Sequence, residues 1–367
     1  MKKNILLIAG TRPNFIKLAP LFHNLKKAAE FRTFICHTGQ HFDFNMSDIF
    51  WESLELPQPD FQLNIKGSGV ADTIGKTILG INEILSKENF DLVVVFGDVN
   101  ATAAGAIVAV QSRIKLMHVE AGLRSYDRDM PEEINRVITD HIADYLMVSE
   151  PSGLTNLQKE GISQDKCCYV GNIMIESLLR SEPKWRAIPF PAALHDLATE
   201  RPFLMTFHRP ENVDRRLSLE RLIQIILALA EKDSVIFPMH PRTLGKMKEF
   251  HLFDVLDQNP RIRLTDPMGY FEFLQIMSKS GLVVTDSGGV QEETSFLNIP
   301  CVTFRKNTER PVTVTLGTNL LMDIWDEDFI EKIREHKENL SSREPVSIPL
   351  WDGEVSKRIL HFMRENL

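Results

Sequence analysis

Carboxylates and a histidine stand directly after short apolar runs in this chain. Asp98 and Glu120 close two such runs, and His208 closes another. These side chain types most often transfer protons in catalysis. Partial burial at the end of an apolar run can tune Glu120 for that task, and Glu132 is a third candidate acid. A helix cap or an ion pair explains any one of these acids equally well, so their joint occurrence carries the catalytic interpretation.

Residues 286–293, DSGGVQEE, have the composition of a phosphate-binding turn. An apolar run leads into Ser287-Gly288-Gly289, and a helical pattern follows. Glycines let the backbone approach a ligand closely, and the free N–H groups at a helix start attract phosphate. Glu292 or Glu293 would then accept hydrogen bonds from ribose hydroxyls. An ordinary cap by Ser287 explains the local sequence equally well.

Basic side chains occupy similar junctions. Arg12 lies in GTRP after the first apolar run, and a guanidinium matches the geometry of a diphosphate. Arg209 and His240 follow two later runs. An exposed loop arginine is the simpler interpretation of Arg12 alone, but all these junctions are expected at one edge of a sheet.

The elements that must position these residues form two series of apolar runs alternating with helical patterns. In the first series, runs at 92–96, 114–119 and 145–148 alternate with helices expected over 100–111 and 131–143. Residues 181–202 are rich in proline and charge and predict an irregular connection. The second series has runs at 203–207, 235–237, 262–264, 282–285 and 301–304. Such runs indicate parallel sheets covered on both faces.

The predicted fold class is therefore α/β, with two doubly wound Rossmann-like domains facing each other across a cleft. Ligands of open α/β sheets bind beyond the carboxyl ends of the strands. We therefore expect the candidate residues to form an enzyme site between the two domains.

Composition narrows the classes of partner. The 367 residues include 42 Lys and Arg against 50 Asp and Glu, a net charge of −8, which argues against nucleic acid or an anionic membrane as main partner. The first apolar run is too short for a signal peptide, and no run approaches the roughly 20 residues of a membrane span. The four cysteines lack CxxC spacing and are expected to be reduced, in the cytoplasm.

Three motif-like segments are discounted. GVADTIGKT at 69–77 departs from the phosphate-loop spacing, and no apolar run leads into it. Asp127-Arg128-Asp129 has the Asp-x-Asp form of a glycosyltransferase metal site, but its charged surroundings favour a surface loop. The sequence lacks the G-x-G-x-x-G motif of dinucleotide-binding proteins, so it does not predict tightly bound NAD. We expect neither a metal nor a cofactor.

Taken together, nine segments resemble the UDP-N-acetylglucosamine 2-epimerase family, in the family's order and over most of the chain. They are GTRPNFIKLAP (10–20), HTGQHFD (37–43), GDVNAT (97–102), HVEAGLRS (118–125), MPEEINR (130–136), HRPEN (208–212), MHPRT (239–243), TDSGGVQEE (285–293) and NTERPVTV (307–314). The GTRP and TERP segments resemble the non-hydrolysing branch. The resemblance implies a glycosyltransferase-B type fold.

The resemblance also implies a reaction, in which UDP is eliminated as the C2 proton leaves and then adds back to a 2-acetamidoglucal after reprotonation at the opposite face. It implies domains at 1–170 and 171–353, a helix over 354–367 packing back on the first domain, UDP binding to the second, and a homodimer. The residues implied as catalytic are Asp98, Glu120, Glu132 and His208. Those implied for substrate and UDP binding are Arg12, Lys17, Arg136, His240, Ser287, Gly288, Gly289, Glu293 and Arg310.

The family pattern is not followed everywhere. Gln40 is kept, but Asp43 stands where many bacterial members have a second glutamine, which argues against activation by a second substrate molecule. Alternatives within this fold are hydrolysis to N-acetylmannosamine and UDP, epimerisation of a UDP-diacetamido-uronic acid, and glycosyl transfer to an acceptor. A catalytically silent nucleotide-sugar-binding regulator is a further alternative.

Overall fold

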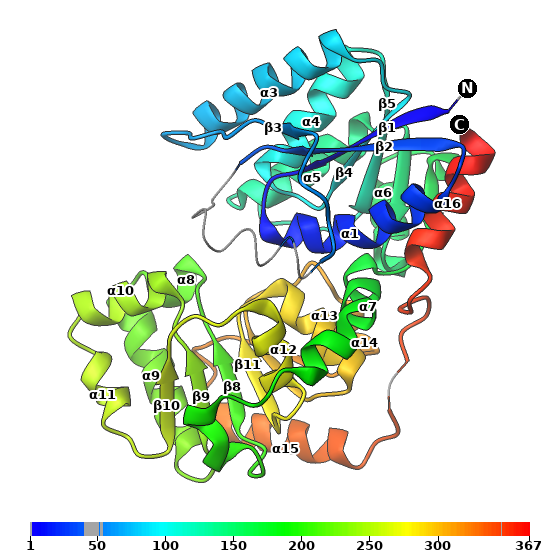
Figure 1. The fold of residues 1–367 in the computed structure, drawn as a ribbon. Helices are drawn as coiled ribbons and strands as arrows, with labels where there is room; N and C mark the ends of the chain where they lie inside the picture. Colours follow the sequence, from blue (N-terminus) through cyan, green and yellow to red (C-terminus); the bar gives the residue numbers. More distant parts are fainter. Residues whose placement is uncertain (1, 40–50, 52–53, 346) are drawn as a thin grey trace. The chain divides into compact units, whose positions relative to one another are not determined.

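The computed structural model describes residues 2–39, 51, 54–345 and 347–367. The chain divides into two compact units, which are described separately. Unit 1 comprises Met1–Arg180 with Pro349–Leu367, and unit 2 comprises Ser181–Ile348 (Figure 1).

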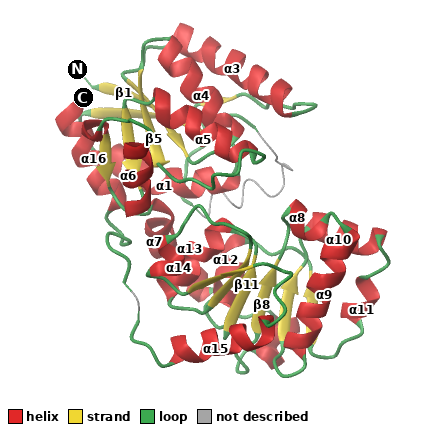
Figure 2. Ribbon diagram, turned by 180° about the vertical axis from the view of Figure 1, so that it is seen from behind, coloured by secondary structure: helices red, strands yellow, loops and turns green. Residues whose placement is uncertain are grey.

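A parallel sheet forms the centre of unit 1. In the described part of this unit it has seven strands, in the order β3-β2-β1-β4-β5-β6-β7. Its middle strand, Leu92–Phe96, is apolar throughout, and Leu6, Val94 and Leu146 are fully buried, because helices cover both faces (Figures 1 and 2). The strands are β1 (Lys3–Ala9), β2 (Phe31–His37), β3 (Phe61–Gln62), β4 (Leu92–Phe96), β5 (Lys115–Ala121), β6 (Tyr145–Val148) and β7 (Cys167–Tyr169).

The helices of unit 1 follow the strands in alternation. They are α1 (Arg12–Lys27), α3 (Val70–Lys87), α4 (Asn100–Gln111), α5 (Pro131–Ile142), α6 (Pro151–Lys159), η1 (Gln164–Lys166), α7 (Ile173–Ala187), which continues into unit 2, and α16 (Val355–Asn366). Helix α4 is apolar around nearly its whole circumference, as expected for a helix that packs against the sheet and against α3 and α5.

The last helix, α16, packs beside α1 in unit 1 (Figures 1 and 2). Asn24 Nδ2 donates to Ser356 Oγ at 2.6 Å, and the carboxylate of Glu176 in α7 accepts the N–H of Ser356 at 2.6 Å. Glu176 therefore caps the start of α16, since the first N–H groups of a helix have no partner within it. Burial raises the pKa of Glu176.

Unit 2 repeats the architecture. Its described part contains a six-stranded parallel sheet in the order β10-β9-β8-β11-β12-β13. The strands are β8 (Phe203–Thr206), β9 (Val235–Pro238), β10 (Ile262–Thr265), β11 (Leu282–Thr285), β12 (Cys301–Phe304) and β13 (Asn319–Met322). The helices are η2 (Ala192–Leu197), α8 (Pro210–Val213), α9 (Arg216–Ala230), α10 (Pro241–Glu249), α11 (Phe253–Asp257), α12 (Tyr270–Met277), α13 (Gly288–Leu297), α14 (Val312–Thr315) and α15 (Phe329–Ser341).

Two predictions about local structure need correction. Residues 181–202 are not wholly irregular, because α7 continues through Pro183 to Ala187 and η2 follows. Leu178 and Trp185 are both fully buried on either side of the proline, and their burial offsets the one backbone hydrogen bond that a proline removes. Strand β5 also extends past the predicted end and includes Glu120.

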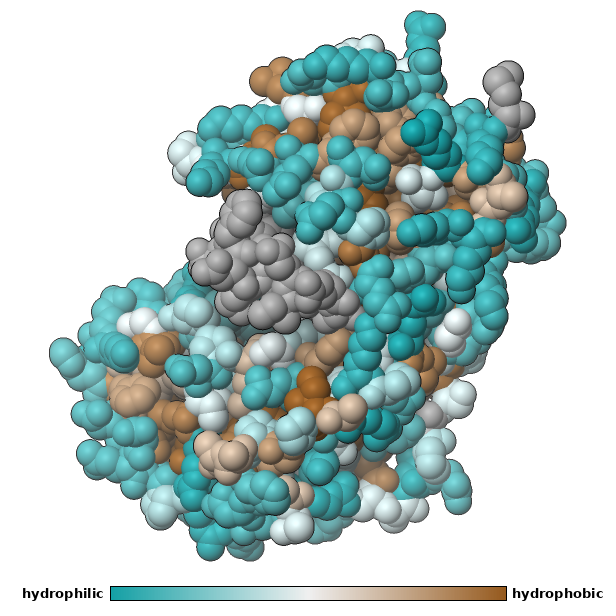
Figure 3. Space-filling view, viewed as in Figure 1, coloured by the Kyte–Doolittle hydropathy of each residue, from teal (hydrophilic) through white to brown (hydrophobic). Residues whose placement is uncertain are grey.

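On the face shown in Figure 3, hydrophilic residues predominate and hydrophobic residues show in smaller patches. Throughout the described chain, every helix is too short or too polar to cross a membrane.

Candidate functional site

The turn after β4 brings Asp98 to the edge of the unit 1 sheet. Gly97 in this turn has φ +60°, in the left-handed region that favours glycine. A Cβ on Gly97 would lie 2.8 Å from Lys17 Nζ and 3.6 Å from Glu120 Oε2. The turn is therefore packed directly against two side chains that the sequence identified as candidates. Asn14, which the sequence reasoning missed, donates from Nδ2 to the carbonyl of Phe96 at 2.9 Å and ties α1 to β4.

Glu120 occupies an irregular position in β5. Its φ is +74°, and the pairing of β5 with β6 shifts register between Val119 and Ala121. A non-glycine residue in this conformation costs on the order of 1–3 kcal/mol and is held by its surroundings. The side chain is buried and forms an ion pair with Lys17. The bulge thus turns one carboxylate out of the strand pattern and toward a buried cation.

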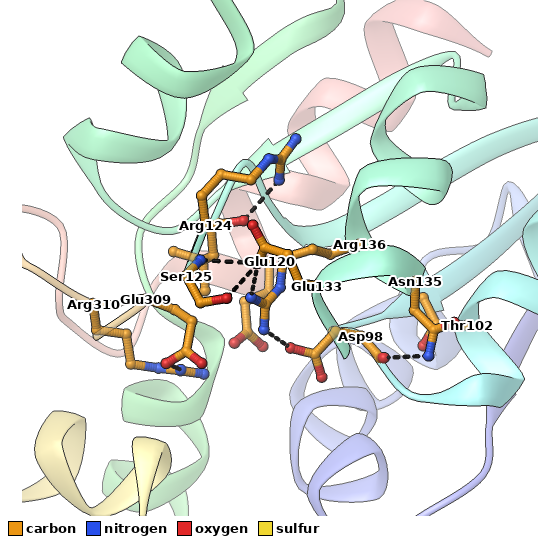
Figure 4. Close-up of polar contacts among 12 residues, drawn as sticks. Asp98, Thr102, Glu120, Arg124, Ser125, Glu133, Asn135, Arg136, Glu309 and Arg310 are labelled. Atoms are coloured by element: carbon orange, nitrogen blue, oxygen red, sulfur yellow. Dashed lines mark hydrogen bonds and ion pairs between the residues drawn. The ribbon is translucent and has the colours of Figure 1, made fainter. Parts of the chain in front are cut away.

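A second ion-paired group lies on α5. Arg136 pairs with Asp98 through one guanidinium nitrogen and with Glu133 through another (Figure 4). Glu133 also accepts the N–H of Ser125 and that of Tyr126, both at 2.9 Å. Arg136 therefore holds the candidate acid Asp98, and Glu133 holds both Arg136 and the loop that follows Glu120.

Helix α5 buries its polar side. Glu133, Arg136 and Asp140 are buried, whereas Ile134 is 45% and Ile138 is 39% exposed. A surface helix normally buries its apolar face. The reversal indicates that the polar face of α5 serves this cluster of charged groups.

Two predicted residues of unit 1 are exposed at helix starts. Arg12 is the first residue of α1, and Glu132 lies in the first turn of α5. Exposure suits contact with an external ligand, so both stay candidates. The sequence did not single out Glu133, because neighbouring acids in a helix point about 100° apart and only the structure fixes which one is buried.

In unit 2, Asp286 organises the loop that carries His208. Its fully buried carboxylate accepts the backbone N–H groups of His208 at 3.1 Å and of Arg209 at 2.8 Å, and Asn212 Nδ2 at 3.1 Å. Burial opposes ionisation, but the imidazole side chain of His208, and after it the hydrogen bonds from Arg209 and Asn212, lower the pKa of Asp286. His208 Nδ1 lies 3.2 Å from the same carboxylate. The imidazole of His208 is thus oriented by a buried anion.

His240 lies next to His208, with ring centroids 5.3 Å apart. His240 is the N-cap of α10, and its Nδ1 accepts the N–H of Arg242 at 3.2 Å. Burial and the neighbouring His208 lower the pKa of His240. The two histidines predicted from the sequence therefore adjoin at one edge of the unit 2 sheet.

The predicted phosphate turn forms the start of α13. Ser287 is the N-cap residue, yet its side chain makes no capping hydrogen bond. A Cβ on Gly288 would lie 2.9 Å from Arg310 Nη1, whereas one on Gly289 would meet nothing within 4 Å. Arg310 pairs with Glu292 at 2.8 Å. The helix start thus combines free space, N–H groups and a guanidinium, the features that bind a phosphate.

Glu293 is buried one turn further along α13. Tyr270 donates its hydroxyl proton to Glu293 Oε1 at 2.8 Å. Burial, with a smaller contribution from the charge of Glu292, raises the pKa of Glu293 to about 8. Burial therefore favours the protonated form of Glu293 at neutral pH.

The segment Asp127-Arg128-Asp129 forms a turn at the surface. Asp127 Oδ1 accepts the N–H of Asp129 at 3.0 Å, as in a surface turn. Within the described residues, no group of three or more His, Cys, Asp and Glu side chains could hold a metal ion. Gln40 and Asp43 lie outside the described residues.

Comparisons with known proteins agree with the motifs. The family model described as UDP-N-acetylglucosamine 2-epimerase matches residues 23–364. A UDP-N-acetylglucosamine 2-epimerase of Methanocaldococcus jannaschii is 41% identical over 99% of each chain. A UDP-2,3-diacetamido-2,3-dideoxy-D-glucuronate 2-epimerase of Pseudomonas aeruginosa is 38% identical over 90% of this chain and 91% of that protein.

A solved structure supports the same relationship. The crystal structure of the M. jannaschii UDP-GlcNAc 2-epimerase in complex with UDP-GlcNAc and UDP has a TM-score of 0.89 and 40% identity, and covers 99% of this chain and 100% of that chain. The predicted fold class, two parallel α/β units of the glycosyltransferase-B type, is confirmed. The predicted family is confirmed as well.

Proposed function

This chain belongs to the UDP-N-acetylglucosamine 2-epimerase family, a family of isomerases, and we propose that it interconverts UDP-N-acetylglucosamine and UDP-N-acetylmannosamine without hydrolysis. The named relatives support the substrate, since both M. jannaschii comparisons concern UDP-GlcNAc 2-epimerase. The GTRP and TERP segments support the non-hydrolysing outcome.

The proposed reaction has two halves. A base takes the proton from C2 of the sugar, the C1–O bond breaks, and its electron pair leaves with UDP, which gives a 2-acetamidoglucal. In the second half a proton is delivered to the opposite face of C2, and the diphosphate oxygen forms the C1–O bond again. Because the proton leaves from one face and returns to the other, the reaction needs at least two acid/base groups.

The carboxylates of unit 1 are proposed for this proton transfer. The proposal rests mainly on the conformation of Glu120. Its carboxylate is buried and paired with Lys17, and its backbone is left-handed. Such an arrangement costs free energy, and strained residues of this kind cluster at functional sites. Asp98, held by Arg136, is the second acid/base group, and the exposed Glu132 is the third. Arg12, Lys17 and Arg136 would complement the negative charge of the substrate.

Unit 2 is proposed to bind UDP. The N–H groups at the Ser287-Gly288-Gly289 turn, together with Arg310, would hold the diphosphate. Glu293 would bind the ribose hydroxyls. His208, oriented by Asp286, would donate to the departing diphosphate with His240 beside it.

Product identification tests this proposal. Purified protein is incubated with UDP-N-acetylglucosamine alone, and the sugars are identified by proton NMR. UDP-N-acetylmannosamine in equilibrium with substrate is expected. Free N-acetylmannosamine with UDP would indicate the hydrolysing reaction. An unchanged substrate that turns over only with an acceptor would indicate a glycosyltransferase, and bound but unchanged substrate would indicate a regulator.

The 38% identity to the P. aeruginosa relative supports one second candidate. UDP-2,3-diacetamido-2,3-dideoxy-D-glucuronate should be assayed in parallel at equal concentration. A larger kcat/KM for this sugar would replace the proposed substrate and keep the chemistry.

A homodimer is proposed as well. The exposed Ile134 and Ile138 lie one turn apart on α5 and support a self-association surface. Light scattering should give twice the mass of the chain. Replacing Ile138 with aspartate should reduce that mass.

A further inference from the structure

His118 is a buried histidine whose two ring nitrogens both face acceptors. It lies on β5 with no exposed surface. Its Nδ1 is 2.7 Å from Asp140 Oδ1, and its Nε2 is 2.8 Å from the carbonyl oxygen of Gly97. A carbonyl oxygen has no proton to give, so Nε2 must be the donor in that hydrogen bond.

Asp140 has no proton to give either. Its other carboxylate oxygen accepts the N–H of Gly122 at 3.1 Å and Nη1 of Arg124 at 2.6 Å. Arg124 is a permanent cation, and its ion pair with this oxygen keeps Asp140 an ionised carboxylate, which only accepts hydrogen bonds. Nδ1 of His118 must therefore also donate. Two donating nitrogens make the ring an imidazolium.

The surrounding charges balance this buried cation. Arg124 forms a bidentate ion pair with Glu160. Its Nε donates to Oε1 at 2.7 Å and its Nη2 donates to Oε2 at 2.6 Å. Two cations, His118 and Arg124, thus face two anions, Asp140 and Glu160. A buried charge is tolerated when it is paired and hydrogen-bonded in this way.

The position of His118 connects it to the proposed acid/base groups. It joins three elements, namely the end of β4 at Gly97, strand β5, and helix α5 at Asp140. Asp98 directly follows Gly97, and Glu120 lies two residues after His118. Gly97 has a flexible backbone and no side chain of its own, so its carbonyl is an effective point at which to fix the turn.

We propose that His118 is a positioning residue that acts as a doubly protonated imidazole. Its Nε2–H fixes the peptide that carries Asp98, and its Nδ1–H locks β5, and with it Glu120, against α5. Errors of about 1 Å in such groups can lower a rate about 100-fold. The part of this proposal that concerns turnover rests on the proposed function.

The proton count can be measured without substrate. Neutron diffraction of deuterium-exchanged crystals at pH 8 should show deuterium on both ring nitrogens of His118. In Asp140→Asn, the neutral amide no longer balances the charge of the imidazolium, so the His118 ring should carry a single deuterium. A single deuterium on His118 in the unaltered protein would overturn the proposal.

Turnover tests the positioning role. His118→Gln should lower kcat at least tenfold, while KM and the Kd for UDP change less than threefold. The exposed His361→Gln on α16 is the matched control and should keep wild-type kcat. If His118→Gln does not fold, Asp140→Asn gives the same comparison and should also lose at least tenfold in kcat.

The outcomes separate this inference from the proposed function. A folded His118→Gln or Asp140→Asn protein with a lower melting temperature but unchanged kcat would make the role merely structural and overturn the proposal. An unaltered protein that binds UDP yet leaves both candidate sugars unchanged would instead overturn the proposed function. In that case the deuterium count still decides whether His118 is the imidazolium inferred here.

Discussion

Glu293→Gln should change how the stability of the protein depends on pH. The amide has the size of the protonated carboxyl, and its carbonyl oxygen can still accept the hydroxyl proton of Tyr270, which lies 2.8 Å from Glu293. Glutamine cannot ionise, however. The substitution therefore removes the titration of one buried group and keeps its main hydrogen bond.

The size of the effect follows from the difference in pKa between the two states. The pKa of Glu293 is raised from 4.5 to about 8 on folding, mainly by burial. Between these values the folded state holds a proton that the unfolded state has released, so stability is greatest below pH 4.5 and falls as the pH rises to 8. One pKa unit corresponds to about 1.4 kcal/mol, so the wild-type protein should lose about 3 kcal/mol between pH 5 and pH 8 through this group.

Guanidinium unfolding of ligand-free protein at pH 5, 6.5 and 8 measures this difference. Glu293→Gln should exceed the wild-type free energy of unfolding by less than about 1 kcal/mol at pH 5 and by about 4 kcal/mol at pH 8. Glu338→Gln, at an exposed position of α15, is the control and should follow the wild-type curve. A wild-type and Glu293→Gln difference that stays constant from pH 5 to pH 8 would refute the reasoning.

Two further predictions concern glycines. Gly288→Leu should weaken UDP binding by more than about 1.4 kcal/mol, the tenfold level, because its Cβ would lie 2.9 Å from Arg310. Gly75→Leu in α3, where a Cβ would meet nothing within 4 Å, is the control. Equal UDP affinity of both variants by calorimetry would remove the turn at Gly288 from the proposed site. Gly97→Ala should lower kcat at least tenfold and the free energy of unfolding by roughly 1–2 kcal/mol. The reason is that the backbone of Gly97 has a φ of +60° and the added Cβ would lie 2.8 Å from Lys17 Nζ. Unchanged kcat and melting temperature would contradict the packing described for this turn.

Much of the fold could be predicted from the sequence, because buried parallel strands are continuous apolar runs. Strands β4, β6, β11 and β12 and helix α4 have the predicted bounds. The continuation of α7 through Pro183 could not be predicted, since it depends on the burial of Trp185, a tertiary contact.

The candidate residues at the strand ends could be predicted from the sequence, whereas the residues that support them could not. Asp98 and His208 follow strands β4 and β8, and Glu120 lies near the carboxyl end of β5, where the rule for α/β sheets places ligand-binding residues. The supporting residues Glu133 and Asp140 lie on α5, where the pattern of isoleucines misleads. A helix is expected to bury its apolar side, but α5 buries its polar side, and no periodicity in the sequence distinguishes the two cases.

The left-handed backbone of Glu120 also had no local signal. Glutamate rarely adopts a φ of +74°, and neither neighbour in the sequence is a glycine. The conformation is imposed by the bulge in β5 and the ion pair with Lys17. Such unfavourable backbone conformations concentrate at functional sites, so local sequence patterns predict the backbone least well at these sites.

The central claim is that the C2 proton is removed and replaced by carboxylates of unit 1, with Glu120 foremost. The direct measurement is the reaction of UDP-N-acetylglucosamine in D2O, with the product analysed by proton NMR for wild-type protein and for Glu120→Gln. The wild-type product should carry deuterium at C2, and a folded Glu120→Gln protein should lose at least about 100-fold in turnover, the lower end of what a positioned acid or base contributes. A wild-type product that keeps protium at C2 would contradict the elimination mechanism, and a folded Glu120→Gln protein with nearly full turnover would contradict the role of Glu120.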